Sequence, residues 1–188
     1  MVQRVRMDRI IIEPLLLIVT AGAFLIIPWR WALAWFAATG VHELFHYIAI
    51  RICRAKIWQI HVGMSGVIIK TDTMLPQQEL LCAIAGPVGS GFMLMFLRVF
   101  PEIAICGCFQ CVFNLLPVYP NDGGRVIKAV LDNCFEPETA VKAVFLVNHA
   151  VFLILLVFGI YIWIRFSTGL LPVLCVLLLW LKTKKSLH

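Results

Sequence analysis

Charged side chains are scarce in this chain of 188 residues: they make up 14% of it, and only ten are acidic. Hydrophobic residues account for 62%, and the mean hydropathy is +0.95. Soluble domains carry about 25% charged residues. The composition therefore excludes an ordinary soluble domain and indicates an integral membrane protein. Because no soluble domain of ordinary size fits in the polar segments that remain, residues 1–188 are predicted to form one membrane-embedded domain.

The sequence predicts neither paired cysteines nor a cleavable leader. The seven cysteines are an odd number and lie mainly in apolar segments, which argues against a disulfide framework. Cys106, Cys108 and Cys111 have a spacing compatible with metal binding, but among Ile, Phe and Val they are interpreted as small packing residues. Glu13 and Pro14 interrupt the first apolar run and no small-residue cleavage site follows, so this run is predicted to be a helix that stays in the protein.

Long apolar runs are abundant, and they predict an all-α polytopic membrane protein with about six transmembrane helices. The sixth contains Gly169 and Pro172 and is short enough to be tilted or only partly inserted. The predicted spans are Ile10 to Ile27, Trp31 to Ile50, Leu80 to Val99, Ile103 to Val118, Ala143 to Ile164, and Phe166 to Leu181.

The basic residues predict the orientation, because loops rich in Lys and Arg stay in the cytoplasm. Of the 16 basic residues, one face receives only Arg30, Arg98 and Arg165, and all the others fall on the opposite face. Both termini are therefore predicted to be cytoplasmic. This topology, with attraction to anionic lipid heads, explains the net charge of +6 without a nucleic-acid partner.

The segment from Ile57 to Thr73 alternates apolar and polar residues and has glycines at 63 and 66. A period of two interrupted by a glycine turn is typical of a β-hairpin. A short hairpin at the cytoplasmic interface is predicted, with an irregular surface loop as the alternative. His61 lies on its polar side and is interpreted as an interfacial histidine.

The third span has small residues four positions apart, Ala85 with Gly89 and Gly86 with Ser90. Such pairs let another helix approach closely in lipid. A packing seam explains them without any chemistry, but we expect this seam to border the functional site. Pro87 removes a backbone donor and should bend or break the helix.

The second span contains the sequence HELFH, which places His42, Glu43 and His46 in an apolar run. Ionisable groups at membrane depth are unfavourable unless they are paired or hydrated. Residues four apart share a helix face, so both imidazoles can bind one metal ion while Glu43 lies beside the first ligand. The pattern predicts a zinc hydrolase, in which zinc activates water and the carboxylate takes its proton.

A catalytic zinc commonly has three protein ligands and an open position, so one ligand is missing. Most other acidic residues lie in loops or at span ends, whereas Asp122 lies in the stretch NLLPVYPNDGG. Pro117 and Pro120 prevent a regular helix there. Broken backbone at membrane depth is tolerated where it is buried or lines a watery cavity. Asp122 is therefore the candidate third ligand, and a surface Asn-Asp-Gly-Gly turn is the alternative.

Together, HELFH, the sequence AGP in the following span and NLLPVYPNDGG resemble the site-2 proteases, intramembrane zinc metalloproteases, over roughly residues 30 to 130. The resemblance implies that His42, His46 and Asp122 bind zinc and that Glu43 is the catalytic glutamate. Asn114 would orient substrate or stabilise the oxyanion. Among bacterial branches the chain looks most like the branch of stage IV sporulation protein FB.

That branch implies a membrane-associated protein substrate such as a pro-sigma factor, cleaved in the mother-cell membrane around the forespore, and it leaves room for inhibitory membrane partners. A rival hypothesis is a zinc-binding transporter or channel, because intramembrane His, Glu and Asp also mark ion paths. A catalytically silent scaffold is a third. His149 is interpreted as hydrogen-bonded within the helix bundle and receives no catalytic role.

Overall fold

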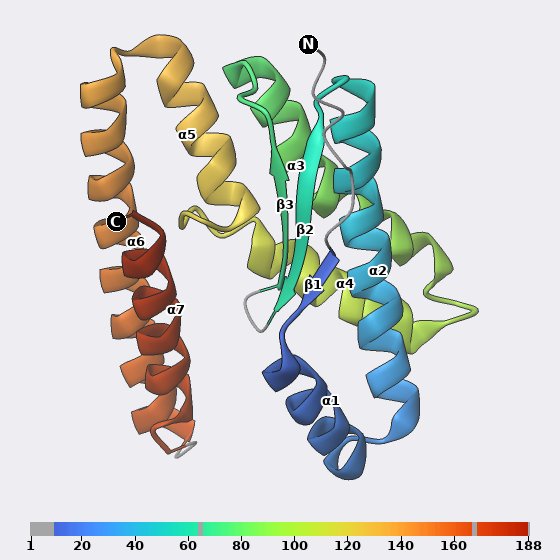
Figure 1. The fold of residues 1–188 in the computed structure, drawn as a ribbon. Helices are drawn as coiled ribbons and strands as arrows, with labels where there is room; N and C mark the ends of the chain where they lie inside the picture. Colours follow the sequence, from blue (N-terminus) through green and yellow to red (C-terminus); the bar gives the residue numbers. More distant parts are fainter. Residues whose placement is uncertain (1–9, 64–65, 167–168, 188) are drawn as a thin grey trace. The chain divides into compact units, whose positions relative to one another are not determined.

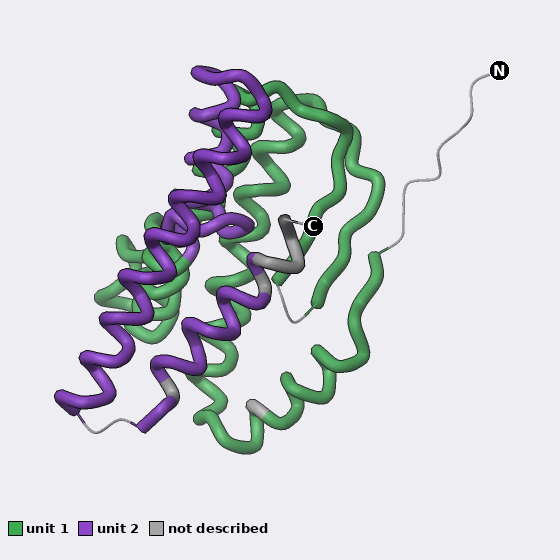
Figure 2. Tube along the Cα trace, turned by 90° about the vertical axis from the view of Figure 1, so that its left-hand side faces the viewer, with its two compact units in different colours: residues 1–113 green, residues 114–188 purple. Residues whose placement is uncertain are grey.

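The computed structural model describes residues 10–63, 66–166 and 169–187 (Figure 1). The chain divides into two compact units, residues 1–113 and 114–188, which are described separately (Figure 2). The elements are β1 (Ile10–Ile12), α1 (Pro14–Ile26), α2 (Trp29–Ile52), β2 (Ile57–Gly63), β3 (Gly66–Thr71), α3 (Pro76–Phe92), the 3-10 turn η1 (Met93–Phe96), α4 (Pro101–Asn114), α5 (Asp122–Cys134), α6 (Pro137–Phe166) and α7 (Leu171–Leu187). The mostly helical class agrees with the prediction.

The first unit begins with a strand where a helix was predicted. Residues 10–12 are three isoleucines, whose branched side chains favour a strand, and β1 runs parallel to β2 with Ile10 opposite Ile60. Pro14 starts α1, since its fixed φ and missing amide hydrogen suit the first helical position. The prediction of one helix over 10–27 is therefore wrong. The 13 residues of α1 extend about 20 Å, less than the bilayer core of about 30 Å.

The predicted hairpin is confirmed. Strands β2 and β3 are antiparallel, with Gly63 paired to Gly66 at the turn, and Gly66 has φ +103°, which strongly favours glycine. The sheet order is β1-β2-β3, and the sheet lies alongside α2 and α3 (Figure 1). Ile57 and Ile69 join it to a core formed by the end of α2 and by α3.

Helices α2 and α3 pack through the predicted small-residue seam. The buried stripe of α2 repeats every fourth residue, which is the spacing of one helix face. Gly86, Gly89 and Ser90 of α3 are buried, and a Cβ at Gly89 would lie 2.6 Å from the Phe45 ring. The α2 stripe consists of Ala34, Ala38, His42, His46 and Ile50. Helix α3 continues through Pro87 without the predicted break, because the close packing of neighbouring helices can hold a proline-containing helix together.

Within the described residues, two helices are long and apolar enough to cross a membrane: Pro76–Phe96 and Pro137–Phe166. The 24 residues of α2 extend about 36 Å, but its apolar run carries the His-Glu-His group. Helix α4 ends at Asn114, before the predicted end at Val118, because Pro117 lacks a helical donor and restricts the residue before it.

The second unit contains a helix that the sequence did not predict. Residues 119–142 lie between two predicted spans, yet α5 starts at Asp122 and α6 at Pro137, earlier than the predicted Ala143. A glycine pair disfavours a helix by propensity, and here packing outweighs that preference. Helix α7 starts at Leu171 and ends later than the predicted Leu181, and residues 167–168 of that predicted span lie outside the described residues.

Candidate metal centre

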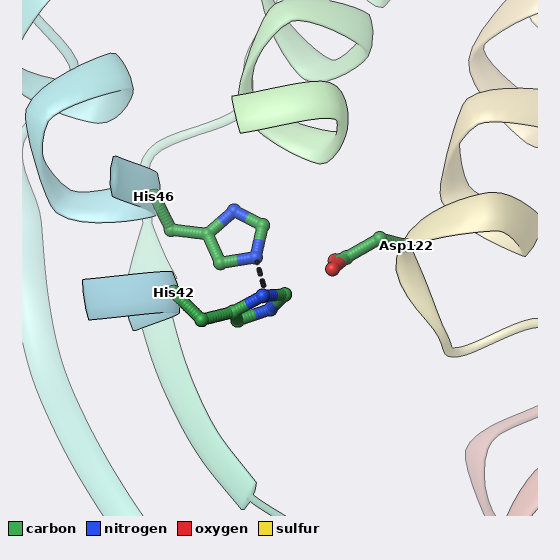
Figure 3. A group of neighbouring side chains, drawn as sticks. All are labelled: His42, His46 and Asp122. Atoms are coloured by element: carbon green, nitrogen blue, oxygen red, sulfur yellow. Dashed lines mark hydrogen bonds between the residues drawn. The ribbon is translucent and has the colours of Figure 1, made fainter. Parts of the chain in front are cut away.

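The two histidines of HELFH lie one turn apart on the buried face of α2. His42 is 5% exposed and His46 is 7% exposed. Their ring centroids are 4.7 Å apart, and the two Nε2 atoms lie 3.1 Å from each other (Figure 3). The prediction that both imidazoles face one point is confirmed.

Helix α3 holds the far side of each ring. His46 Nδ1 lies 2.7 Å from the carbonyl oxygen of Cys82, and His42 Nδ1 lies 2.8 Å from Ser90 Oγ. A carbonyl oxygen only accepts, so His46 Nδ1 carries the proton and donates it. In the neutral ring, His46 Nε2 is then an acceptor. Such hydrogen bonds at the far nitrogen are the usual way in which a metal-binding histidine is oriented.

The 3.1 Å between the two Nε2 atoms requires something positive between them. With one proton between these atoms, His42 Nε2 donates to His46 Nε2, and Ser90 then donates to His42 Nδ1. A cation can replace that proton, in which case His42 Nδ1 donates to Ser90 instead. A hydroxyl can both donate and accept, so Ser90 suits both states.

Gly86 gives the rings their space. A Cβ built at this position would lie 2.1 Å from His46 Nε2 and 2.8 Å from His42 Cε1. The expectation that the small-residue seam borders the site is therefore confirmed. The sequence did not single out Gly86 or Ser90 as partners of the imidazoles, although their spacing of four on a neighbouring helix was the available signal.

Asp122 is the first residue of α5 in the second unit and is 6% exposed. Its carboxylate Oδ1 lies 3.4 Å from Arg125 Nη1, one turn further along. A negative charge is also favoured at a helix N-terminus, where unpaired amide groups point outward. The buried aspartate is thus stabilised as a carboxylate, the form that binds a metal.

His42, His46 and Asp122 form a group of three buried potential ligands. Each offers one ligand atom, and these atoms lie within 4.8 Å of one another (Figure 3). Two imidazole nitrogens and a carboxylate oxygen are a donor set that suits zinc and leaves a fourth position for water or substrate. The facing Nε2 atoms and this donor set fit the predicted zinc ion.

The distances in the site do not test the roles predicted for the two catalytic residues. Glu43 follows His42 on α2 and is half-buried, and Asn114 is the half-buried last residue of α4. Their roles stay predictions. His149 is exposed, and its Nδ1 donates to the carbonyl oxygen of Phe145 on the same helix at 2.8 Å, so the interpretation of a hydrogen bond to another part of the helix bundle stays a prediction. Cys106 packs as a small apolar residue in a buried cluster.

Comparison with known proteins finds similarity in sequence and in structure. A zinc metalloprotease of Methanocaldococcus jannaschii is 29% identical over 139 residues, which cover 66% of this chain and 41% of that protein. The solved structure of a site-2 protease from the same organism matches with a TM-score of 0.69 at 24% identity, over 93% of this chain and 87% of that one. This chain has the fold of a site-2 protease. No protein-family profile matches it, and it spans less than half the length of the relative that it matches in sequence.

Proposed function

We propose that the protein is an intramembrane zinc metalloprotease of the site-2 type, which hydrolyses a peptide bond of a membrane-associated protein. The observation that carries the proposal is the pair of facing imidazole Nε2 atoms, 3.1 Å apart, in a group of three potential ligands. The site-2 protease fold and the similarity to a zinc metalloprotease support it.

His42, His46 and Asp122 would hold the zinc ion. Bound zinc supplies Lewis-acid chemistry and lowers the pKa of a coordinated water toward about 7. Glu43 would accept a proton from the attacking water and pass it to the leaving amine, the ordinary work of a general base and acid. Asn114 would donate a hydrogen bond to substrate or to the developing oxyanion.

The surface supports a place in the membrane. Many large apolar side chains are exposed on helices that include the two of membrane-spanning length, among them Leu153, Ile154 and Val157 of α6. Exposed apolar patches of this extent need a non-aqueous environment. The distribution of basic residues supports the further proposal that the protein is a multi-pass protein of the cell membrane with both termini in the cytoplasm.

The substrate would be bound as an extended strand, because a helical peptide bond is shielded by its own hydrogen bonds. Strand β3 is last in the order β1-β2-β3, so a substrate strand could add to it by β-augmentation. A pro-sigma factor or another membrane-tethered regulator in sporulation is the substrate that the sequence resemblance favours. That assignment stays a prediction.

The test is co-expression of the protein with a candidate membrane-tethered substrate, as wild type, as Glu43→Gln and as His149→Gln. Zinc content is measured by elemental analysis of each purified protein. We expect Glu43→Gln to abolish cleavage while about one zinc remains bound, because it removes only the proton acceptor. His149→Gln, on an exposed position of α6, is the matched control and should cleave like the wild type.

Cleavage by Glu43→Gln at the wild-type rate would exclude the mechanism. Reconstitution in liposomes tests the rival function. If the wild type transports zinc across the bilayer and cleaves no substrate, the protein is a transporter instead.

A further inference from the structure

The position of the Asp122 carboxylate depends on the loop that precedes it. Residues 115–121 are not helical, and two bonds hold them in a compact turn: Val118 N donates to Leu116 O at 2.7 Å, and Asn121 N donates to Val118 O at 2.8 Å. Asn121 is the N-cap of α5, so the end of this loop fixes where the helix and its first residue begin.

The first turn of α5 is pressed against the same loop. A Cβ at Gly123 would lie 2.2 Å from the Leu115 carbonyl oxygen, and one at Gly124 would lie 2.1 Å from the Tyr119 nitrogen. Only glycine permits backbones to approach this closely. The loop and the start of α5 therefore move together, and whatever holds the loop also holds Asp122.

Helix α6 provides that support through two residues on one face. Val118 is fully buried in a cluster with Phe152 of α6. One turn earlier, Asn148 Oδ1 accepts a hydrogen bond from Tyr119 N at 3.0 Å. Tyr119 precedes Pro120, which has no amide hydrogen, so the Tyr119 donor is one of few that the loop can use as an anchor.

Asn148 is 1% exposed, and its Nδ2 atom has no hydrogen-bond partner in the described part of the chain. An unpaired buried donor is destabilising, and an apolar side chain would avoid it. Val144, one turn before it on the same buried face, is such a side chain. The buried amide of Asn148 is therefore less favourable for stability than an apolar side chain would be. Its hydrogen bond to the loop explains why an amide occupies this position.

We propose that Asn148 is a positioning residue for the metal ligand Asp122. Its amide oxygen holds the loop 115–121 through Tyr119, the loop holds the first turn of α5, and that turn places the carboxylate. The inference rests on the proposed function, because it assigns Asp122 to the zinc ion. Asn148 itself touches neither metal nor substrate.

The experiment uses the full chain in lipid nanodiscs and two probes. Zinc affinity is measured by competition with a chromogenic chelator, and Co²⁺ is added in place of zinc because its visible spectrum reports ligand geometry. Four variants are compared: Asn148→Leu, Asn148→Ser, Asn148→Asp and Val144→Ala. Asn148→Leu removes the oxygen that accepts from Tyr119 N, and in Asn148→Ser the side chain is too short to reach Tyr119. Asn148→Asp keeps an acceptor oxygen at the same place. Val144→Ala removes buried volume on the same helix face without touching the loop bond.

We expect Asn148→Leu and Asn148→Ser to bind zinc at least about tenfold more weakly and to change the cobalt spectrum, as loss of an outer support does at metal sites. Asn148→Asp and Val144→Ala should keep the wild-type spectrum. If the Asn148→Leu protein does not fold, the Asn148→Ser protein tests the positioning role, since a hydroxyl is tolerated in a helix. Wild-type affinity and spectrum in Asn148→Ser would overturn the positioning role alone. If the wild type binds no zinc, or Asp122→Asn binds it as tightly as the wild type, the proposed function fails instead.

Discussion

Gly86 offers the sharpest test of the metal centre, because one methyl group added there would meet the ligand atom itself. The Cβ of Gly86→Ala would lie 2.1 Å from His46 Nε2, which is about the length of a zinc–nitrogen bond. Ordinary Cβ contacts begin at 3.4 Å. The Nε2 atom must therefore move by about 1.3 Å or the helices must separate.

Neither movement is easy. Each ring is held at Nδ1, by Cys82 at 2.7 Å and by Ser90 at 2.8 Å, so rotation breaks a buried hydrogen bond. We expect zinc affinity to fall at least about 100-fold, equivalent to about 2.7 kcal/mol, and cleavage to disappear. Overpacking of the seam should lower the free energy of unfolding by about 1–3 kcal/mol.

The matched control is Gly91→Ala on the same helix, where the nearest atom to an added Cβ is Cys111 Sγ at 3.9 Å. Alanine is the better helix former by up to about 1 kcal/mol, so this variant should be as stable as the wild type or slightly more stable. Zinc affinity by chelator competition and thermal melting check both variants. Wild-type zinc affinity in Gly86→Ala would refute the arrangement of the two imidazoles against α3.

Two further predictions concern the same centre. Ser90→Ala removes the partner of His42 Nδ1 and should weaken zinc binding about 10- to 100-fold, measured by the same competition, whereas Ser90→Thr keeps the hydroxyl and tests whether that group is responsible. Chelation of the metal should stop cleavage of the co-expressed substrate in isolated membranes, and zinc should restore it; full activity in the chelated protein would exclude metal catalysis.

Much of the candidate site could be predicted from local sequence patterns. HELFH on a helix has only one way to bring two imidazoles to one face, so His42 and His46 followed from spacing alone. The small residues of α3 were recognisable as a seam because close helix approach in lipid has few other sources. The hairpin was predictable because alternation and a glycine turn are both short-range signals.

Features that depend on contacts between distant parts of the chain could not be predicted from the sequence. The three isoleucines at 10–12 were predicted to start an apolar helix. They form a strand because they pair with β2, about fifty residues later. The helix from Asp122 was hidden by Gly123 and Gly124, whose poor propensity is outweighed by the close backbone contact that they permit. The bond from Asn148 to Tyr119 joins two segments that no sequence period connects.

The parallel pairing of β1 with β2 also constrains the order of events during synthesis. Ile10 leaves the ribosome some fifty residues before its partner Ile60, which at about 5–20 residues per second is a wait of about 3–10 seconds. During that interval an isoleucine-rich edge is open to any other strand nearby. The sheet can therefore close only after α2 and the hairpin strand β2 have been produced.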